Sequence, residues 1–195
     1  MGCIKEYWKT IDYNLKKYTP STYETLAPPA TDAEIYKLIK NIALPIPDSL
    51  IESLLIHNGQ IDSNYMNPFL DYQHLLSSSE IIENYSMMND IFPDEDTVYY
   101  IDESTCRIVK RNFIWNKKWM PFTNCNGDGL LLDFTPAQYG EIGQIFYRPN
   151  SGMPPDKALA SSYEDWLNKI SLIFENGDFQ VEDSMVMLNN FTFNW

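Results

Sequence analysis

The spacing of apolar residues changes twice along the chain, and these changes constrain the fold more than any other feature. Helical spacing occurs in five segments, which are 4–15, 35–42, 51–55, 81–88 and 163–174. Short β-type runs separated by turn formers occur at 98–101, 108–109, 119–122, 130–134 and 144–147, with 69–75 as a further candidate. This order predicts a single α+β domain, with a mixed, mainly antiparallel sheet flanked by N-terminal helices and a C-terminal helix.

Capping residues predict where several of these helices begin and end. Three capping boxes of the form Ser/Thr-x-x-Glu precede apolar stripes: Thr31 with Glu34, Ser77 with Glu80, and Ser161 with Glu164. In such a box the hydroxyl and the carboxylate each accept a hydrogen bond from a backbone N–H at the helix start. Asp48 is the predicted N-cap of the third helix and Asn58-Gly59 its left-handed end, while Gly177 is predicted to end the last helix.

Composition limits the chain to one domain. With 195 residues, of which 44% are apolar, the chain is long enough to bury one core, and Trp8, Trp119 and Trp166 are expected inside it. No apolar stretch reaches the roughly 18 residues of a membrane-spanning helix, and the N-terminus lacks the apolar segment of a secretory signal. The three cysteines fit no disulfide or zinc spacing, which predicts reduced thiols and a cytoplasmic location. Gly2-Cys3 resembles an acylated N-terminus, but the myristoylation pattern requires Ser or Thr where Glu6 stands.

The net charge of −13 is distributed unevenly. Residues 1–40 carry six Lys against five acids, residues 41–106 carry twelve acids and no Lys or Arg, and residues 107–118 carry five basic residues and no acid. An acidic field repels nucleic acid and anionic membranes and attracts cationic partners. The segregation therefore predicts a partner protein with a basic surface, and neither nucleic acid nor membrane as a partner. An acidic surface kept for solubility alone explains the same composition and stays open.

The motifs that resemble metal or catalytic sites have simpler structural interpretations. The spacing Asn124-x-Asn126-x-Asp128 is similar to a calcium loop, but the first ligand is not a carboxylate and Thr135 stands where the bidentate Glu is required. A hairpin turn explains these residues better. The consecutive acids 94–96 fit a solvated loop better than a metal site.

The sequence evidence for a catalytic pair is equally weak. A Cys125–His57 nucleophile has no local sequence support, and His57 and His74 are too few for a histidine-rich metal site. Asp128 and Asp133 flank one strand, where turn and strand-end hydrogen bonding is the ordinary role. We therefore predict no enzymatic activity, no metal and no cofactor.

An ordered series of short motifs resembles the SUKH superfamily, which includes fungal cell-wall-synthesis regulators and bacterial toxin-immunity proteins. The series runs over about residues 4–175 and consists of Trp8, Pro29-Ala30-Thr31, Glu34, Leu44-Pro45, Leu54-Leu55, His57-Asn58-Gly59-Gln60, Trp119-x-Pro121-Phe122, Gly127-Asp128, Leu132-Asp133, Gly143-Gln144-Ile145 and Ser162-x-x-x-Trp166-Leu167. Two segments depart from the pattern, because the acidic stretch around 60–103 and the residues after 178 are additions to it. The resemblance implies a domain over 1–178 with an acidic insertion, followed by a C-terminal extension over 179–195.

The resemblance also implies a function without catalysis. It favours a cytoplasmic immunity protein that binds and neutralises a cognate toxin used in contact-dependent competition. Its alternative is a regulatory protein-binding scaffold similar to the fungal members. A toxin directed at nucleic acid presents a basic groove to phosphates, and an acidic inhibitor could fill that groove.

The acidic stretch then supplies the candidate partner contacts. Its acidic candidates are Asp62, Asp71, Glu80, Glu83, Asp90, Asp94, Glu95, Asp96, Asp102 and Glu103. Its candidate aromatic anchors are Tyr65, Tyr72, Tyr99 and Tyr100. Both kinds are needed, because charge supplies association rate and selectivity more than affinity.

Overall fold

The fold alternates helices and short strands over the whole chain. A computed structural model describes residues 3–61, 66–93, 99 and 101–188. The helices are α1 (Ile4–Tyr18), α2 (Pro20–Thr25), α3 (Asp32–Asn41), α4 (Asp48–Leu54), α5 (Ser78–Ile91) and α6 (Tyr163–Asn176), with a 3-10 turn at Glu103–Thr105. The strands are β1 (His74–Leu75), β2 (Trp119–Pro121), β3 (Thr123–Asn124), β4 (Gly129–Asp133), β5 (Gln144–Arg148), β6 (Phe179–Glu182) and β7 (Met185–Leu188).

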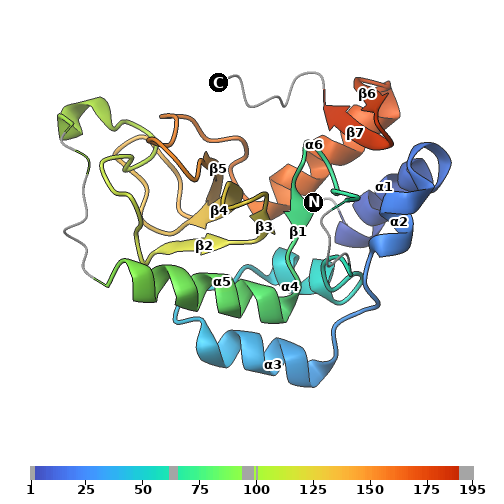
Figure 1. The fold of residues 1–195 in the computed structure, drawn as a ribbon, viewed down its shortest axis with the longest axis horizontal. Coiled ribbons are helices and arrows are strands. Elements are labelled where there is room, and N and C mark those ends of the chain that lie inside the picture. Colours follow the sequence, from blue (N-terminus) through green and yellow to red (C-terminus); the bar gives the residue numbers. More distant parts are fainter. Residues whose placement is uncertain (1–2, 62–65, 94–98, 100, 189–195) are drawn as a thin grey trace.

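The strands in the described part of the chain form three small sheets (Figure 1). The largest has the order β2-β4-β5, with Leu132 opposite both Met120 and Ile145. β1 pairs with β3, and β6 pairs with β7. Each of these ladders between the described strands is antiparallel. The prediction of a single α+β domain flanked by N-terminal and C-terminal helices is confirmed.

The helices cover the sheet in two groups. α5 packs along β2, and α3 packs on the outer side of α5 (Figure 1). On the other side α1 packs against α6, and α6 contacts β5. The apolar stripe predicted for 4–15 is the buried side of α1, where Ile4, Trp8, Ile11 and Leu15 are inaccessible to solvent. Packing of these amphipathic faces stabilises the helices more than intrinsic propensity does.

Aromatic rings join the two groups in the core. Trp8, Trp119 and Trp166 are at most 3% exposed, which confirms their predicted burial. Phe69 lies between Trp8 and Trp166, with ring centroids 5.7 and 6.2 Å away. Phe122 meets the Trp166 ring edge to face at 5.0 Å. These are favoured geometries for aromatic pairs.

Two of the three capping boxes form as predicted. The Glu34 carboxylate accepts the Thr31 N–H at 2.8 Å, and the Thr31 hydroxyl accepts the Glu34 N–H at 3.3 Å. Ser77 and Glu80 make the same reciprocal pair at 2.7 and 3.3 Å. The box predicted at Ser161 is wrong by one residue, because Ser162 is the N-cap and accepts a hydrogen bond from the backbone of Asp165.

The predicted ends of α4 are also wrong. The N-cap is Pro47, and Asp48 is the first helical residue. The helix ends at Leu54, five residues before Gly59. Gly177, in contrast, ends α6 in the left-handed conformation with φ 73°, as predicted.

Several strand predictions fail for identifiable reasons. Residues 108–109 form no strand, because the backbone N–H groups of Arg107, Ile108 and Val109 all donate to the Asp156 carboxylate. In the run 98–101, residues 98 and 100 lie outside the described residues, and 99 and 101 are not in a strand. Of the candidate run 69–75, only β1 is extended, and it follows a tight turn.

The helix α2 and the β6–β7 hairpin have no counterpart in the prediction. The short α2 begins with Pro20 directly after α1. The β6–β7 hairpin turns at Asp183 and Ser184, which both have positive φ. Neither residue is glycine, so the usual sequence signal of a tight hairpin is missing.

Candidate partner-binding surface

The structure describes the side chains of half of the predicted contact residues. Those outside the described residues, or with an undescribed side chain, are Asp62, Tyr65, Asp94, Glu95, Asp96, Tyr100 and Glu103. Glu80, Glu83 and Asp90 lie on α5, and the remaining four are dispersed over other parts of the fold.

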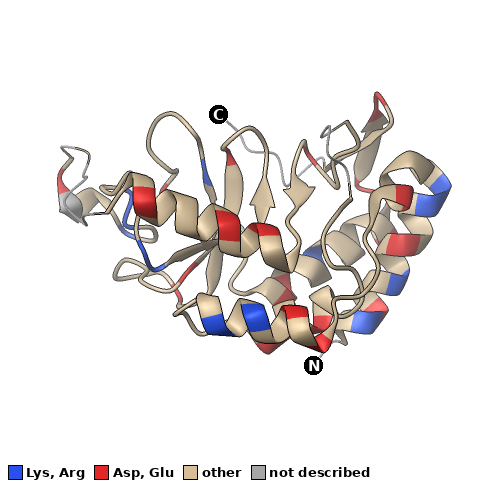
Figure 2. Cartoon of the chain, turned by 60° about the horizontal axis from the view of Figure 1, so that its bottom comes forward, with Lys and Arg blue, Asp and Glu red and all other residues tan. Residues whose placement is uncertain are grey.

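One face of α5 combines acidic and apolar side chains. Glu83 and Asp90 are exposed, and Met87 and Ile91 between and beyond them are 49% and 57% exposed. These four residues lie at i, i+4, i+7 and i+8, so they share one side of the helix. Figure 2 shows the acidic residues along the outward side of α5. This set, called here the outer face of α5, is opposite the buried Ile81 and Tyr85.

Asp71 is buried in the fold and is therefore no longer a candidate partner contact. Its carboxylate is 6% exposed and accepts the Leu188 N–H at 2.9 Å, while its own N–H donates to Val186. Burial raises the pKa of Asp71 to about 6. Asp71 therefore holds β7 against the tight turn at 71–72, where both residues have positive φ. The neighbouring Tyr72 is 57% exposed, as a partner contact requires.

The last two candidates lie near the basic segment. The Tyr99 hydroxyl donates to the Gly152 carbonyl at 2.8 Å. Asp102 is exposed, and the Ser104 backbone N–H that it accepts lowers the pKa of its carboxyl group. The structure thus brings together only the α5 residues among the described candidates.

A groove opens where α3 and α5 begin, and no local sequence pattern predicts it. Its volume is about 630 Å³. One capping carboxylate lines it from each helix, Glu34 from α3 and Glu80 from α5. The apolar part of its lining comes from Ala27, Pro28, Pro29 and Ile61. Residues 46 positions apart supply the two carboxylates, which is why local patterns missed the pair.

Asn58 connects the two helix starts across this groove. Its side-chain amide donates to the Glu34 carboxylate at 3.3 Å, and its carbonyl oxygen accepts the Ser78 N–H at 2.8 Å. Gln60 next to it contacts Thr25, Asn67 and Leu75 through its side chain. Gly59 allows this close approach, since a Cβ there would collide with the backbone of Leu76 and Ser77.

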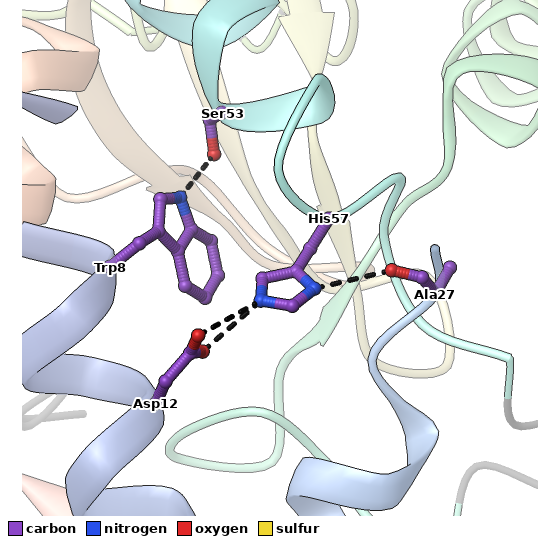
Figure 3. A network of polar contacts seen from close by, with 5 residues as sticks. All are labelled: Trp8, Asp12, Ala27, Ser53 and His57. Carbon is purple, nitrogen blue, oxygen red and sulfur yellow. Dashed lines mark hydrogen bonds and ion pairs between the residues drawn. The ribbon is translucent and has the colours of Figure 1, made fainter. Parts of the chain in front are cut away.

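His57 belongs to the same junction and not to a catalytic pair (Figure 3). Its ring contacts the Ala27 carbonyl at 3.2 Å and the Asp12 carboxylate at 3.1 Å. Beside it the Trp8 indole donates to the Ser53 hydroxyl at 2.8 Å, and Ser53 contacts the Tyr163 hydroxyl at 2.9 Å. The segment 57–60 therefore fastens α1, α3, α4 and α5 together.

The alternative catalytic sites lack the necessary geometry. Cys125 lines a pocket with His74 and not with His57. Burial, and secondly the charge of Asp128, raises the pKa of the Cys125 thiol, which disfavours the nucleophilic thiolate. Asp128 and Asp133 stand at opposite ends of β4, about 16 Å apart along the strand, so they cannot act on one bond.

The carboxylate of Asp133 has a full set of structural partners. It accepts hydrogen bonds from the Trp119 indole, the Thr135 N–H and the Gln144 amide at 2.9 to 3.2 Å. The residues whose spacing is similar to a calcium loop form a hairpin turn, as predicted, in which Asn126 and Gly127 have positive φ. Within the described residues, no three His, Cys, Asp or Glu side chains gather closely enough to hold a metal ion.

No helix in the described part of the chain combines the length and apolar character needed to cross a membrane. The geometry defines an α+β domain with a helical outer surface and a polar junction at 57–60. The chain belongs to the SMI1 / KNR4 family (SUKH-1), whose model matches residues 29–169. That match confirms the resemblance described from the motifs and covers the junction, α5 and the central sheet. No curated protein matches the chain.

Proposed function

We propose that this chain is an immunity protein that binds a cognate toxin in the cytoplasm and neutralises it by covering its surface, without catalysis. Family membership supports this class of function, since immunity proteins are part of the superfamily that the motifs resemble. The observation that carries the proposal is the outer face of α5. There two exposed carboxylates and two exposed apolar side chains share one side of a helix.

This combination suits binding to a basic protein surface. Glu83 and Asp90 lie about 10 Å apart along the helix axis, a separation that spans neighbouring basic residues of a partner. Their charge increases the encounter rate with a toxin whose groove has evolved to hold phosphates. Met87 and Ile91 supply the apolar contact that gives an interface most of its affinity.

The test is complex formation with the toxin domain encoded beside this gene. The purified proteins are expected to form a 1:1 complex by isothermal titration calorimetry and to suppress the activity of the toxin. Met87→Asp is the diagnostic variant, because it places an unpaired charge in the apolar centre of the face. A matched control is Val181→Asp on β6, since Val181 is 43% exposed and far from α5 in the sequence.

Three outcomes decide between the classes of function. Weakened binding by Met87→Asp alone supports the proposal. No complex, together with no protection of cells that express the toxin, contradicts it. The absence of any toxin gene beside this one favours the alternative, a regulatory protein-binding scaffold similar to the fungal members that the motifs resemble.

A further inference from the structure

The groove between the first turns of α3 and α5 is a second feature that can recognise a partner. It is lined by two carboxylates, Glu34 and Glu80, and by an apolar surface that includes Pro28, Pro29 and Ile61. Ile61 is 70% exposed, so this apolar surface is open to a visiting side chain. The volume of about 630 Å³ lies within the range of ligand pockets, about 300–1,000 Å³.

The charge of the groove selects the sign of its occupant. Among the described residues that line it there is no Lys, Arg or His. Lys37, one turn further along α3, is exposed and lies outside this lining. Hydrogen bonds from the Thr31 backbone and hydroxyl lower the pKa of Glu34, so this carboxylate stays ionised at neutral pH.

Helix starts ordinarily attract anions, but here a carboxylate of the chain itself already lies at each helix start. The N–H groups of Thr31 and Ser77 donate to Glu34 and Glu80 themselves. A further anion would meet two carboxylates before it reached the helix dipoles. The groove therefore favours a cation.

Both carboxylates are also held in place before a partner arrives. Each is fixed by its capping box, and Asn58 connects Glu34 to the first turn of α5. A carboxylate oxygen has two lone pairs, so a capped Glu can still accept hydrogen bonds from a second donor. Because these side chains are ordered beforehand, binding loses little conformational entropy.

We propose that this groove receives an arginine side chain of the partner protein. The guanidinium has a planar fork of N–H donors that can reach carboxylates on two walls, and its weak hydration lets it leave water readily. Its aliphatic stem would lie on the Pro28, Pro29 and Ile61 surface. The inference rests on the proposed function for the identity of the partner, and it adds a second contact point at the start of α5.

The role of the two carboxylates can be tested by removing their charge without disrupting the capping boxes. Glutamine serves in a capping box as glutamate does, so Glu34→Gln with Glu80→Gln removes two charges and keeps both helix starts. With the neighbouring toxin domain, this double variant is expected to raise the Kd about 10- to 100-fold. The control Glu182→Gln, an exposed acid on β6, is expected to change the Kd less than about 2-fold. Thermal denaturation of both variants verifies that the fold is retained.

A double-mutant cycle identifies the arginine. Each surface arginine of the toxin domain is changed to alanine and measured against wild type and the double variant. One arginine is expected to lose its effect when Glu34 and Glu80 are glutamine, since the cycle isolates the shared interaction. If every arginine keeps its full effect in the double variant, the groove is not an arginine pocket.

Failure of this inference is distinguishable from failure of the proposed function. A complex that Met87→Asp weakens and the double variant leaves unchanged overturns the groove alone. If no toxin complex forms, the probe is N-acetyl-arginine amide in an amide NMR titration of the free protein. Shifts confined to 31–34 and 77–80 that disappear in the double variant support the pocket, and their absence overturns it.

Discussion

Asp71 is an acidic residue that the fold buries beside β7, where its carboxylate accepts a hydrogen bond from the Leu188 N–H. Neither burial nor a partner 117 residues away is visible in local sequence. Trp8, Trp119 and Trp166 were predictable, because large apolar rings have one favourable environment.

The ionisation of Asp71 predicts a measurable pH dependence. Its pKa is raised to about 6 in the fold against 3.8 for the ordinary side chain, so the folded state holds the proton more tightly. Its contribution to stability is therefore complete below about pH 4 and is lost as the pH rises through 6. Asp71→Asn keeps the acceptor for Leu188 and cannot ionise. It should be more stable than wild type by about 3 kcal/mol at pH 8 and by about 1.5 kcal/mol at pH 5.

Urea denaturation at the two pH values measures this difference. Asp178→Asn is the control, because Asp178 is exposed just after α6. An Asp71→Asn variant that is less stable than wild type at pH 8 would show that the carboxylate is needed in its charged form.

The Ser53 hydroxyl predicts a second residue-scale effect. It lies between the Trp8 indole and the Tyr163 hydroxyl, and all three residues are at most 3% exposed. Ser53→Ala leaves both neighbours without this partner in the core and should cost about 2–4 kcal/mol of unfolding free energy. Tyr163→Phe removes one member and leaves the Trp8–Ser53 bond, so about 1–2 kcal/mol is expected. Chemical denaturation of both variants checks the order, and a larger loss in Tyr163→Phe would contradict the network.

At the scale of elements, helix starts were more predictable than strands. A capping box is a local device, so Thr31 and Ser77 identified α3 and α5 directly. Ser161-Ser162 and Glu164-Asp165 offer two registers for one box, and only tertiary packing selects Ser162. The segment 108–109, predicted as a strand, forms none because its backbone N–H groups donate to Asp156, which is almost 50 residues away in the chain.

Gly59 and Gly177 form a matched pair for testing one element contact. Both have positive φ, of 74° and 73°. A Cβ at Gly177 would meet nothing within 4 Å, whereas at Gly59 it would collide with the backbone of Leu76 and of Ser77, the N-cap of α5. Gly177→Ala should therefore cost about 1 kcal/mol from backbone strain alone. Gly59→Ala should cost about 3 kcal/mol or more, because the helix start must also move.

Thermal and urea unfolding of the two glycine variants gives the comparison. Equal losses of stability in the two variants would mean that the backbone around residue 59 can move at little cost. The close contact at Gly59 would then not fix the position of α5. In that case the groove beside Gly59 would also be more flexible than expected from its two capping boxes.

At the scale of the whole molecule, the unequal distribution of charge was evident from sequence, and its arrangement on the surface was not. The stretch without Lys or Arg contributes Glu83 and Asp90 to the outer face of α5, while α3 beside it carries Lys37 and Lys40 (Figure 2). The groove combines Glu34 and Glu80 from separate parts of the chain, one outside the acidic stretch. Only the folded arrangement of two helices could reveal it.

This arrangement predicts a division between association and dissociation rates with the toxin domain. Glu83→Gln with Asp90→Asn should lower the association rate constant about 5- to 10-fold at low salt and leave dissociation nearly unchanged. The difference from wild type should shrink toward 1 M salt, where the Debye length falls to about 3 Å. Ile91→Ala should instead accelerate dissociation. Surface plasmon resonance at two salt concentrations separates the rates, and equal effects on association by both variants would remove the distinction.

The hydrogen bonds of Asn58 have a consequence for how this protein could be mimicked. One wall of the groove comes from α3, the other from α5, and the amide between them comes from the loop after α4. The site is thus a conformational epitope, which no linear peptide reproduces. A synthetic α5 could compete for the acidic helical face, but it would carry only half of the arginine pocket. A miniaturised inhibitor would need to retain all three segments in their folded register.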